Sequence, residues 1–204
     1  MNMTTPYNKT DKTIAYLNKQ YSKLFRKLTS FDELNVIEVS HEIYNEVLKL
    51  VEQESTRLVK AVYDSYSENH TISAADATAF VLALMLAYNP VTKYVYKNEL
   101  ERKRSRFAEG VIASDSPIEE VELAKRLLVA LNRQFEDDVT FDTVVKAFED
   151  DGVKEVRWIT AVDDKRCAEC KSRHNKIYPI HKIPPKPHRY CRCYVEKNKI
   201  TGDK

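Results

Sequence analysis

The sequence predicts a mainly α-helical protein in which a helical body is followed by a small, cysteine-rich α+β module. Only three glycines occur among 204 residues, and glycine is one of the residues least favoured inside helices. Apolar residues recur every three or four positions through most of residues 11–150, the period of a helix with one buried face. All four cysteines lie after residue 166, where this period has ceased, so a different kind of structure is expected there.

The first two helices are predicted over residues 11–29 and from about residue 30 to about residue 69. Residues 1–10 are polar and lack periodicity, so we expect them to be disordered. Ser30–Glu33 has the pattern of a capping box, in which side chains satisfy the free N–H groups at a helix start. The apolar stripe continues to Tyr66, which makes the second helix a long one.

A third helix is predicted to begin at Ser73, again through a capping side chain. Residues 80–88 are apolar on nearly every side of that helix, which predicts a position in the centre of the bundle. Asn89-Pro90 is expected to end it and to start a fourth helix, because proline fits the first helical turn. The fourth helix is expected to end near Gly110.

Two more helices complete the predicted helical domain, which spans residues 11–152. Pro117 opens the fifth helix, and its apolar pattern continues to Phe135. A short sixth helix is expected over residues 141–150, with Gly152 ending it. The segment KEVRWIT then alternates apolar and polar residues, so residues 153–160 are predicted to form a strand. It opens a Cys/His-rich module over residues 153–195, and residues 196–204 are expected to be a flexible tail.

Charge is divided unevenly along the chain. Residues 151–204 carry 14 Lys and Arg against 7 Asp and Glu, a net charge of +7, whereas residues 1–150 carry 19 against 24, a net charge of −5. A basic end on an acidic body favours contact with nucleic acid or an acidic partner. The basic run 102–106 is expected to be a solvated helix face, because nearby glutamates dilute it.

The sequence gives no sign of secretion or membrane insertion. The first twelve residues, MNMTTPYNKTDK, contain no apolar core of a signal peptide. The longest apolar run, residues 80–88, has nine residues, far fewer than a bilayer requires. We therefore expect cytosolic synthesis and no membrane partner. In a reducing compartment, clustered cysteines favour metal binding over disulfides.

The cysteines form two close pairs. Cys167 and Cys170 are a C-x2-C pair, and after 20 residues Cys191 and Cys193 are a C-x-C pair, with His188 three positions before Cys191. Two such pairs supply four ligands to a tetrahedral, structural zinc ion. Either Cys193 or His188 has suitable spacing for the fourth ligand; we favour Cys193, with His188 as the alternative.

The order of residues around these pairs resembles a known family. Trp158, Asp163 and C-x2-C are followed by NKIY at 175–178 and by PPKPHRYCRC at 184–193. This order is similar to the C-terminal signature of phage minor head proteins, the Mu F-like head morphogenesis family. The resemblance covers roughly residues 130–195. The chain differs from the family at Asn175, where glycine is usual, at Arg189, where proline is usual, and at residues 133–135, Arg-Gln-Phe in place of Arg-Thr-Glu.

The resemblance implies a low-copy virion component. Such a protein is made in the host cytoplasm, binds at or near the portal protein inside the head, and assists capsid assembly and the retention or ejection of DNA. Its partners would be the portal, other head proteins and packaged DNA, the last without sequence preference. The sequence shows no nucleophile–base pair, no phosphate-binding glycine loop and no open metal site, so we expect no enzymatic activity and assign no catalytic residue.

Two alternatives come from other functional classes. His181-Lys182-Ile183-Pro184 weakly resembles the His-Ile-x-Pro centre of HNH nucleases, which would make the chain a zinc-containing nuclease. Those enzymes need a further Asn and His on a later helix, and the 11 residues after Cys193 contain no histidine. A zinc-bearing DNA-binding protein is the other alternative, but no recognition helix is predicted after the cysteine pairs.

Overall fold

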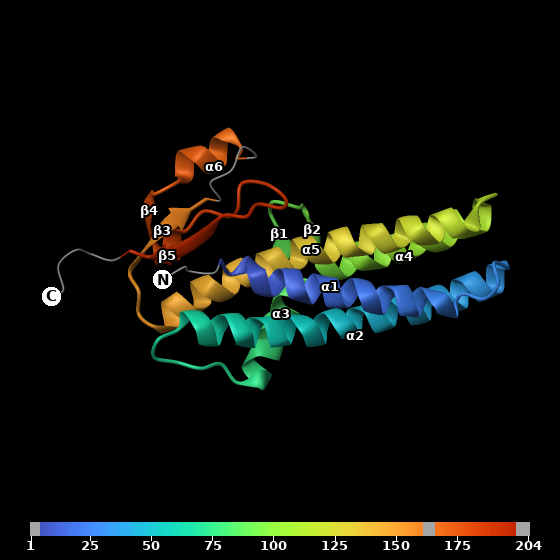
Figure 1. The fold of residues 1–204 in the computed structure, drawn as a ribbon, viewed down its shortest axis with the longest axis horizontal. Coiled ribbons are helices and arrows are strands. Elements are labelled where there is room, and N and C mark those ends of the chain that lie inside the picture. Colours follow the sequence, from blue (N-terminus) through green and yellow to red (C-terminus); the bar gives the residue numbers. More distant parts are fainter. Residues whose placement is uncertain (1–4, 161–165, 199–204) are drawn as a thin grey trace.

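The computed structural model describes residues 5–160 and 166–198 and confirms the mainly helical fold with a small strand-containing C-terminal region (Figure 1). Four long helices run side by side: α1 (Tyr7–Leu24), α2 (Glu33–Tyr66), α4 (Tyr96–Ala113) and α5 (Pro117–Asp150). A short 3-10 turn, η1 (Phe25–Lys27), follows α1. With 34 residues each, α2 and α5 are about 51 Å long. The α1–α2 and α4–α5 turns lie at one end of the bundle, and the C-terminal module lies at the other.

Helix α1 begins earlier than predicted. Tyr7 and Thr10 belong to it and are buried. The Thr10 hydroxyl is 2.8 Å from that of Thr140 on α5, and the Tyr7 hydroxyl donates to the carbonyl of Cys193 at 2.6 Å. The expected disorder of residues 1–10 is therefore wrong for residues 7–10, because partners distant in the sequence bury this polar segment. Residues 1–4 lie outside the described part of the chain.

The predicted caps are partly right. Asp32, rather than Ser30, caps α2, and its side chain accepts a hydrogen bond from the N–H of Asn35 at 3.0 Å. Helix α2 ends at Tyr66, three residues earlier than expected. Ser73 caps α3 (Ala74–Leu86) as predicted, accepting from the N–H of Asp76 at 3.0 Å.

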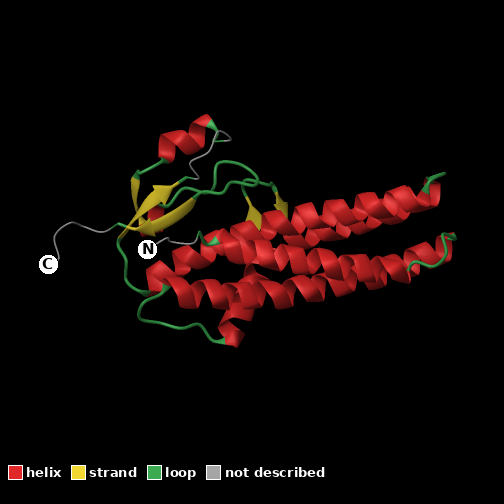
Figure 2. Cartoon of the chain, viewed as in Figure 1, coloured by secondary structure: helices red, strands yellow, loops and turns green. Residues whose placement is uncertain are grey.

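The central position predicted for the third helix is wrong. Helix α3 lies on the outside of the bundle (Figure 2) and packs against α2 and α4. Val81 and Met85 are buried there, whereas Leu82 is 40% and Leu86 62% exposed. Residues 80–86 of α3 are all apolar, so their pattern could not indicate that only one face is covered.

The fourth helix does not start at Pro90. A small antiparallel hairpin lies there, formed by β1 (Tyr88–Asn89) and β2 (Tyr94–Val95). The side chain of Asn89 accepts hydrogen bonds from the N–H groups of Val91 and Thr92 at 2.9 and 3.0 Å, which stabilises the turn. Helix α4 begins only at Tyr96 and continues through Gly110 to Ala113.

The predicted fifth and sixth helices are one continuous helix, α5. The apolar pattern is interrupted at residues 136–140 because polar side chains are buried there. The Ser55 hydroxyl donates to Glu136 at 2.7 Å, Lys186 donates to the carbonyl of Asp137 at 2.6 Å, and Thr140 contacts Thr10. In this part of α5, polar contacts with other elements take the place of the apolar contacts that a continuous buried helix is expected to make.

The C-terminal module is a three-stranded antiparallel sheet with two short helical segments. Strand β3 (Glu155–Ile159), within the predicted strand 153–160, lies between β4 (Ile177–Pro179) and β5 (Tyr194–Lys197). Helix α6 (Ala168–Arg173) and the turn η2 (Ile180–Lys182) flank β4 in sequence. The prediction of a flexible tail from residue 196 is wrong for Glu196 and Lys197, because both pair with β3. Residues 199–204 lie outside the described chain.

The module shares a core with the bundle. Leu58 and Val62 of α2 and Phe141, Val144 and Phe148 of α5 form one buried cluster with module residues Val156, Trp158, Cys170, Cys191, Cys193 and Val195. A second, larger cluster fills the rest of the bundle. The boundary expected at residue 152 is therefore crossed by a continuous core, and the module rests on the ends of α2 and α5.

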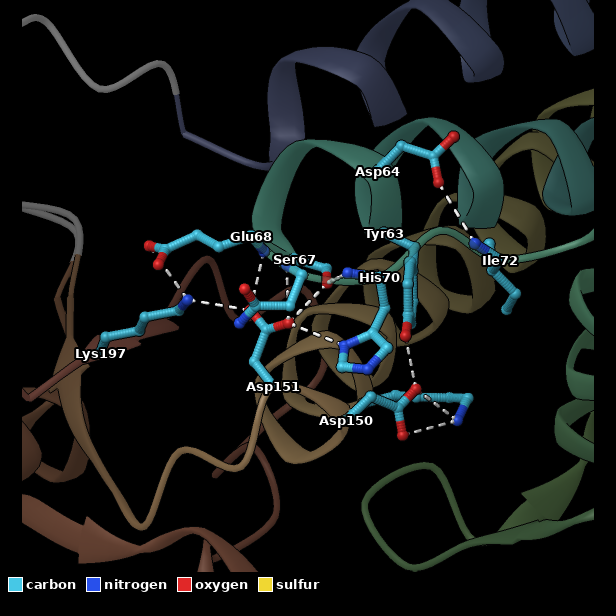
Figure 3. A network of polar contacts seen from close by, with 11 residues as sticks. Tyr63, Asp64, Ser67, Glu68, His70, Ile72, Asp150, Asp151 and Lys197 are labelled. Carbon is cyan, nitrogen blue, oxygen red and sulfur yellow. Dashed lines mark hydrogen bonds and ion pairs between the residues drawn. The ribbon is translucent and has the colours of Figure 1, made fainter.

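Asp151 joins α2, α5 and β5 at this end of the bundle (Figure 3). Its carboxylate accepts hydrogen bonds from the backbone N–H of Glu68 at 2.8 Å, the Ser67 hydroxyl at 2.7 Å and Lys197 at 3.0 Å, and lies 3.1 Å from the ring of His70. The side chain of Asp151 is only 1% exposed. Burial alone would raise its pKa, but these hydrogen bonds hold the pKa of Asp151 far below its usual value.

No helix within the described residues is apolar over a length that could span a bilayer.

Candidate metal centre

The first cysteine pair is positioned by α6. Cys167 is the residue before this helix, and its sulfur accepts a hydrogen bond from the N–H of Cys170 at 3.2 Å. This contact turns both thiol side chains to the same side of the helix start, as a C-x2-C ligand pair requires. Asp163, part of the family signature, lies outside the described residues.

The second pair follows a loop that is held at several points. Arg173 of α6 donates to the carbonyl of Pro185 at 2.6 Å, and the buried Lys186 reaches α5. The backbone of Cys193 accepts from Tyr7, and β5 begins directly after it. Prolines restrict the remaining freedom of this loop. The loop therefore brings the C-x-C pair back to the first pair at the edge of the sheet.

All five ligands predicted from the sequence meet at this place. The ligand atoms of Cys167, Cys170 and His188 lie within 4.8 Å of one another, and so do those of Cys170, Cys191 and Cys193. Cys170 belongs to both groups: its sulfur is 3.2 Å from Nε2 of His188 and 3.7 Å from the sulfur of Cys191. With Zn–S bonds of about 2.3 Å, two thiolates on a tetrahedral ion are about 3.8 Å apart. The cluster has the spacing to hold a metal ion.

The electrostatics of the thiols also suit a cation. A hydrogen bond from the Cys193 thiol lowers the pKa of Cys191 to about 6. Burial raises the pKa of Cys170 to about 12, and the hydrogen bond to Cys191 followed by burial raises the pKa of Cys193. Among these three cysteines, only Cys191 is thus favoured as a thiolate. Several thiolates this close repel one another, so full ionisation needs a bound cation.

Two neighbouring groups orient the candidate ligands. His188 Nδ1 is 2.8 Å from the carbonyl of Arg189, so this nitrogen donates and the lone pair of Nε2 faces the sulfur of Cys170 at 3.2 Å, the usual orientation of a metal-binding histidine. The indole N–H of Trp158 is buried without a hydrogen-bond acceptor. It lies close enough to the sulfur of Cys193 to favour its thiolate form. A metal-bound thiolate would give this buried donor an acceptor, so the donor set fits a thiolate-bound metal.

Trp158 packs in the same buried cluster as Cys170, Cys191 and Cys193. It is fully buried in β3, with its ring 5.6 Å from Phe141 of α5 and 6.2 Å from Tyr178 of β4, centre to centre. The guanidinium of Arg173 stacks 5.2 Å from the centre of the ring. Trp158 therefore connects the cysteine-bearing edge of the sheet to the bundle.

An open cleft of about 330 Å³ borders the cluster, and the sequence did not reveal it. Besides Cys167, Cys170, Cys193 and His188, its lining includes Arg133, Asp137, Thr160, Arg166, Tyr190 and Arg192. Arg133 pairs with Asp11 at 2.6 Å and with Asp137 at 3.3 Å. Burial raises the pKa of Asp137 to about 6 against the opposing charges of Lys186 and Arg133. The i, i+4 spacing of Arg133 and Asp137 is typical of an ion pair on one helix. Nothing in that spacing indicates that the pair lies beside the cysteines.

Two other histidines of the module fall outside the cluster. His174 accepts from the N–H of Thr160 at 3.2 Å, and His181 is exposed on η2; neither belongs to the two ligand groups. Asn175 has a φ of 63°, as expected of a residue standing where the family has glycine. Gln134, in place of the family's threonine, accepts from the N–H of Tyr190 at 2.7 Å and so holds the loop between His188 and Cys191.

The basic run 102–106 is paired within α4. Arg102 donates to Glu99 at 2.7 Å and Arg104 to Glu101 at 2.9 Å. The glutamates thus partly neutralise this face, as the sequence predicted.

Comparison with known proteins gives no relative: no family model, no curated protein and no solved structure matches the chain.

Proposed function

We propose that the cysteine cluster binds one structural zinc ion through Cys167, Cys170, Cys191 and Cys193, with His188 as the alternative to Cys193. The thiol-rich donor set supports this choice of metal, because soft sulfur ligands at tetrahedral spacing favour zinc over magnesium or calcium. A bound zinc ion would supply charge compensation for the thiolates and a cross-link between α6 and the loop before β5.

We further propose that the chain is a phage minor head protein, bound to the portal inside the head. The observation that carries this proposal is the ordered set of Trp158, the C-x2-C pair, His188 and the C-x-C pair, brought together around one centre. The protein would be made in the host cytoplasm and enter the virion, where it assists head assembly and the retention or ejection of DNA. A long helical bundle offers extended faces for such protein contacts.

The basic module is proposed to contact packaged DNA without sequence preference. Its exposed basic side chains include Lys154, Lys171, Lys176 and Lys182, and phosphate contacts of this kind weaken steeply as salt rises. Reversing Lys171 and Lys182 to Glu should lower DNA affinity several-fold in gel-shift assays and reduce its salt dependence. The matched control reverses Lys12 and Lys19, two exposed lysines of α1. Equal losses in both double variants would contradict a role of the module in DNA binding.

The assembly role is tested in the phage that encodes the chain. Tagged protein should co-purify with the portal protein, and virions should contain it at far lower copy than the major capsid protein. Deletion of the gene should give misassembled or poorly infectious heads. Normal heads and full infectivity after deletion would contradict the proposal.

The nuclease alternative makes an opposite prediction for His181. On the assembly proposal, His181→Ala leaves infectivity close to wild type, because this exposed side chain belongs to neither ligand group. If the purified wild type cleaves DNA in a metal-dependent way, and His181→Ala abolishes cleavage while the module stays folded, the chain is a nuclease and the assembly proposal is wrong.

A further inference from the structure

A small apolar pocket lies between the end of α3, the β1–β2 hairpin and α5. It has a volume of about 130 Å³, and its lining includes Tyr88, Tyr94, Tyr96, Phe135, Asp138 and Asp142. Sites for cofactors and other small molecules usually measure roughly 300–1,000 Å³. The pocket therefore suits the end of one side chain rather than a whole cofactor.

Aromatic rings form much of the pocket. Tyr96 and Phe135 stack with their centres 4.3 Å apart, and Tyr96 is held by a hydrogen bond to Asn132. Tyr94 is half-buried, and Tyr88 is 62% exposed. The electron-rich faces of such rings attract organic cations.

Two carboxylates share the pocket with these rings, and only one of them is neutralised. Asp138 accepts hydrogen bonds from Asn89 at 2.8 Å and Gln134 at 2.9 Å, and Lys186 lies 3.6 Å away. Asp142 has no hydrogen-bond or ion-pair partner among the described residues. Burial raises the pKa of Asp142 to about 7, Asp138 adds to this rise, and Lys186 opposes it. A half-buried carboxylate without a partner is costly, and a cation beside it would remove that cost.

The surface beside the pocket is apolar and uncovered. Leu82 and Leu86 are one helical turn apart on the outer face of α3, and Leu86 and Tyr88 are each 62% exposed. Exposed apolar surface that surrounds a pocket is typical of protein-binding sites. Here the bundle is acidic, with a net charge of −5 over residues 1–150, so it complements a basic partner rather than an acidic one.

We propose that this pocket receives a lysine or arginine side chain from a partner protein, whose apolar surface covers the outer face of α3. The aromatic rings would surround the stem and head of that side chain, and Asp142 would pair with its charge. None of the five candidate metal ligands lines this pocket, whereas Lys186 and Arg189 of the module border it at Asp138 and Tyr94.

The first test uses small molecules that mimic the ends of arginine and lysine side chains as probes. Butylguanidinium and butylammonium, titrated into the full-length protein, should give saturable NMR shifts at Tyr88, Asn89 and Tyr94, whereas uncharged 1-butanol should not. Asp142→Asn should weaken this binding about tenfold or more. The fold should not change, because the side chain of Asp142 forms no hydrogen bond or ion pair with any described residue. Asp115→Asn, at an exposed carboxylate in the α4–α5 turn, is the matched control. Equal shifts with butanol, or unchanged binding by Asp142→Asn, would overturn the proposal.

The second test includes the apolar face. A synthetic amphipathic helix with one arginine in its leucine face should bind the wild type about tenfold more tightly than the same peptide with norleucine at that position. Asp142→Asn should remove this preference, and Leu86→Ser should weaken both peptides. Lack of an arginine preference would refute the pocket's role. Sedimentation of the protein alone tests whether a second copy is the partner. A dimer that both Asp142→Asn and Leu86→Ser dissociate would overturn the proposal of a different partner protein.

Discussion

At the scale of single residues, the candidate metal ligands were the most predictable part of the molecule. Cys167, Cys170, Cys191, Cys193 and His188 were all expected from spacing alone, and the structure brings all five together. Close pairs of cysteines are constrained by bond lengths along a few residues, so their spacing predicts their geometry. Arg133, Asp137 and Tyr7 reach the same region from distant helices, and no local pattern could predict that.

Replacement of one cysteine tests the centre directly. Cys191→Ser should lower the zinc content of protein purified under reducing conditions from about one ion per chain to near zero. It should also unfold the module, because binding of structural zinc contributes about 10 kcal/mol or more to folding. His181→Ala should retain zinc and fold. Elemental analysis and Trp158 fluorescence measure both effects; a folded, metal-free module in Cys191→Ser would show that metal is not needed there.

The fourth ligand can be identified by exchanging zinc for cadmium-113. The cadmium NMR shift separates four sulfur ligands from three sulfurs and one nitrogen. If Cys193 is the ligand, His188→Ala should leave the shift unchanged and Cys193→Ser should alter it or abolish binding. The reverse result would assign the position to His188, whose Nε2 lies 3.2 Å from Cys170.

Asp151 is expected to control stability in acid. Its folded pKa is far below the usual value, so its contribution is complete above the unfolded pKa of about 3.9 and is lost as pH falls below that value. Asp151→Asn should cost about 3 kcal/mol at pH 7, since hydrogen bonds to a buried charge are lost, and should flatten the fall in stability below pH 4. Asp115→Asn should do neither. Urea unfolding between pH 2 and pH 7 provides the measurement.

At the scale of elements, the errors share one cause. The pattern of α5 appeared to stop after Phe135 because Glu136, Asp137 and Thr140 are polar, yet all three are buried. Glu136 and Thr140 have side-chain partners on α2 and α1. The side chain of Asp137 pairs with Arg133 of α5 itself, and its backbone carbonyl accepts from Lys186 in the loop before β5. Likewise, the apolar run that begins at residue 80 predicted a central helix, but α3 has one exposed face. Periodicity describes one helix at a time, whereas burial depends on what the other elements supply.

The contact between α2 and α5 at Glu136 should respond to pH. Burial raises the pKa of Glu136 to about 8, although the hydrogen bond from Ser55 opposes the rise. Because the unfolded pKa is about 4.3, the folded state holds the extra proton between these values, and stability should fall as pH rises from about 4 to 8. Glu136→Gln should reduce this fall, to which the raised pKa values of Asp137 and Asp142 also contribute, and should stabilise the protein at pH 8 by up to about 3 kcal/mol. Glu38→Gln, on the exposed face of α2, should leave the fall intact; a wild type equally stable at pH 5 and pH 8 would contradict the argument.

At the scale of the whole molecule, the sequence predicted the two parts but not their union. The change from helical to alternating pattern near residue 152 marked the start of the module, and β3 lies there. That change could not show that Phe141, Val144 and Phe148 of α5 share a core with Val156 and Val195. The helical body and the module are therefore expected to depend on each other.

Metal removal tests this dependence. Without the metal, the loop carrying Cys191 and Cys193 should leave the edge of the sheet and expose the shared core. A chelator under reducing conditions should then shift the emission of Trp158, the only tryptophan, to the red. It should also raise amide exchange at residues 58–66 and 141–150, which face the module, while residues 36–51 of α2 keep their protection within the larger core. Re-addition of zinc should reverse the changes. Loss of protection over all of α2 would mean that the two cores unfold as one, and protection retained at 141–150 would mean that the bundle folds without the module.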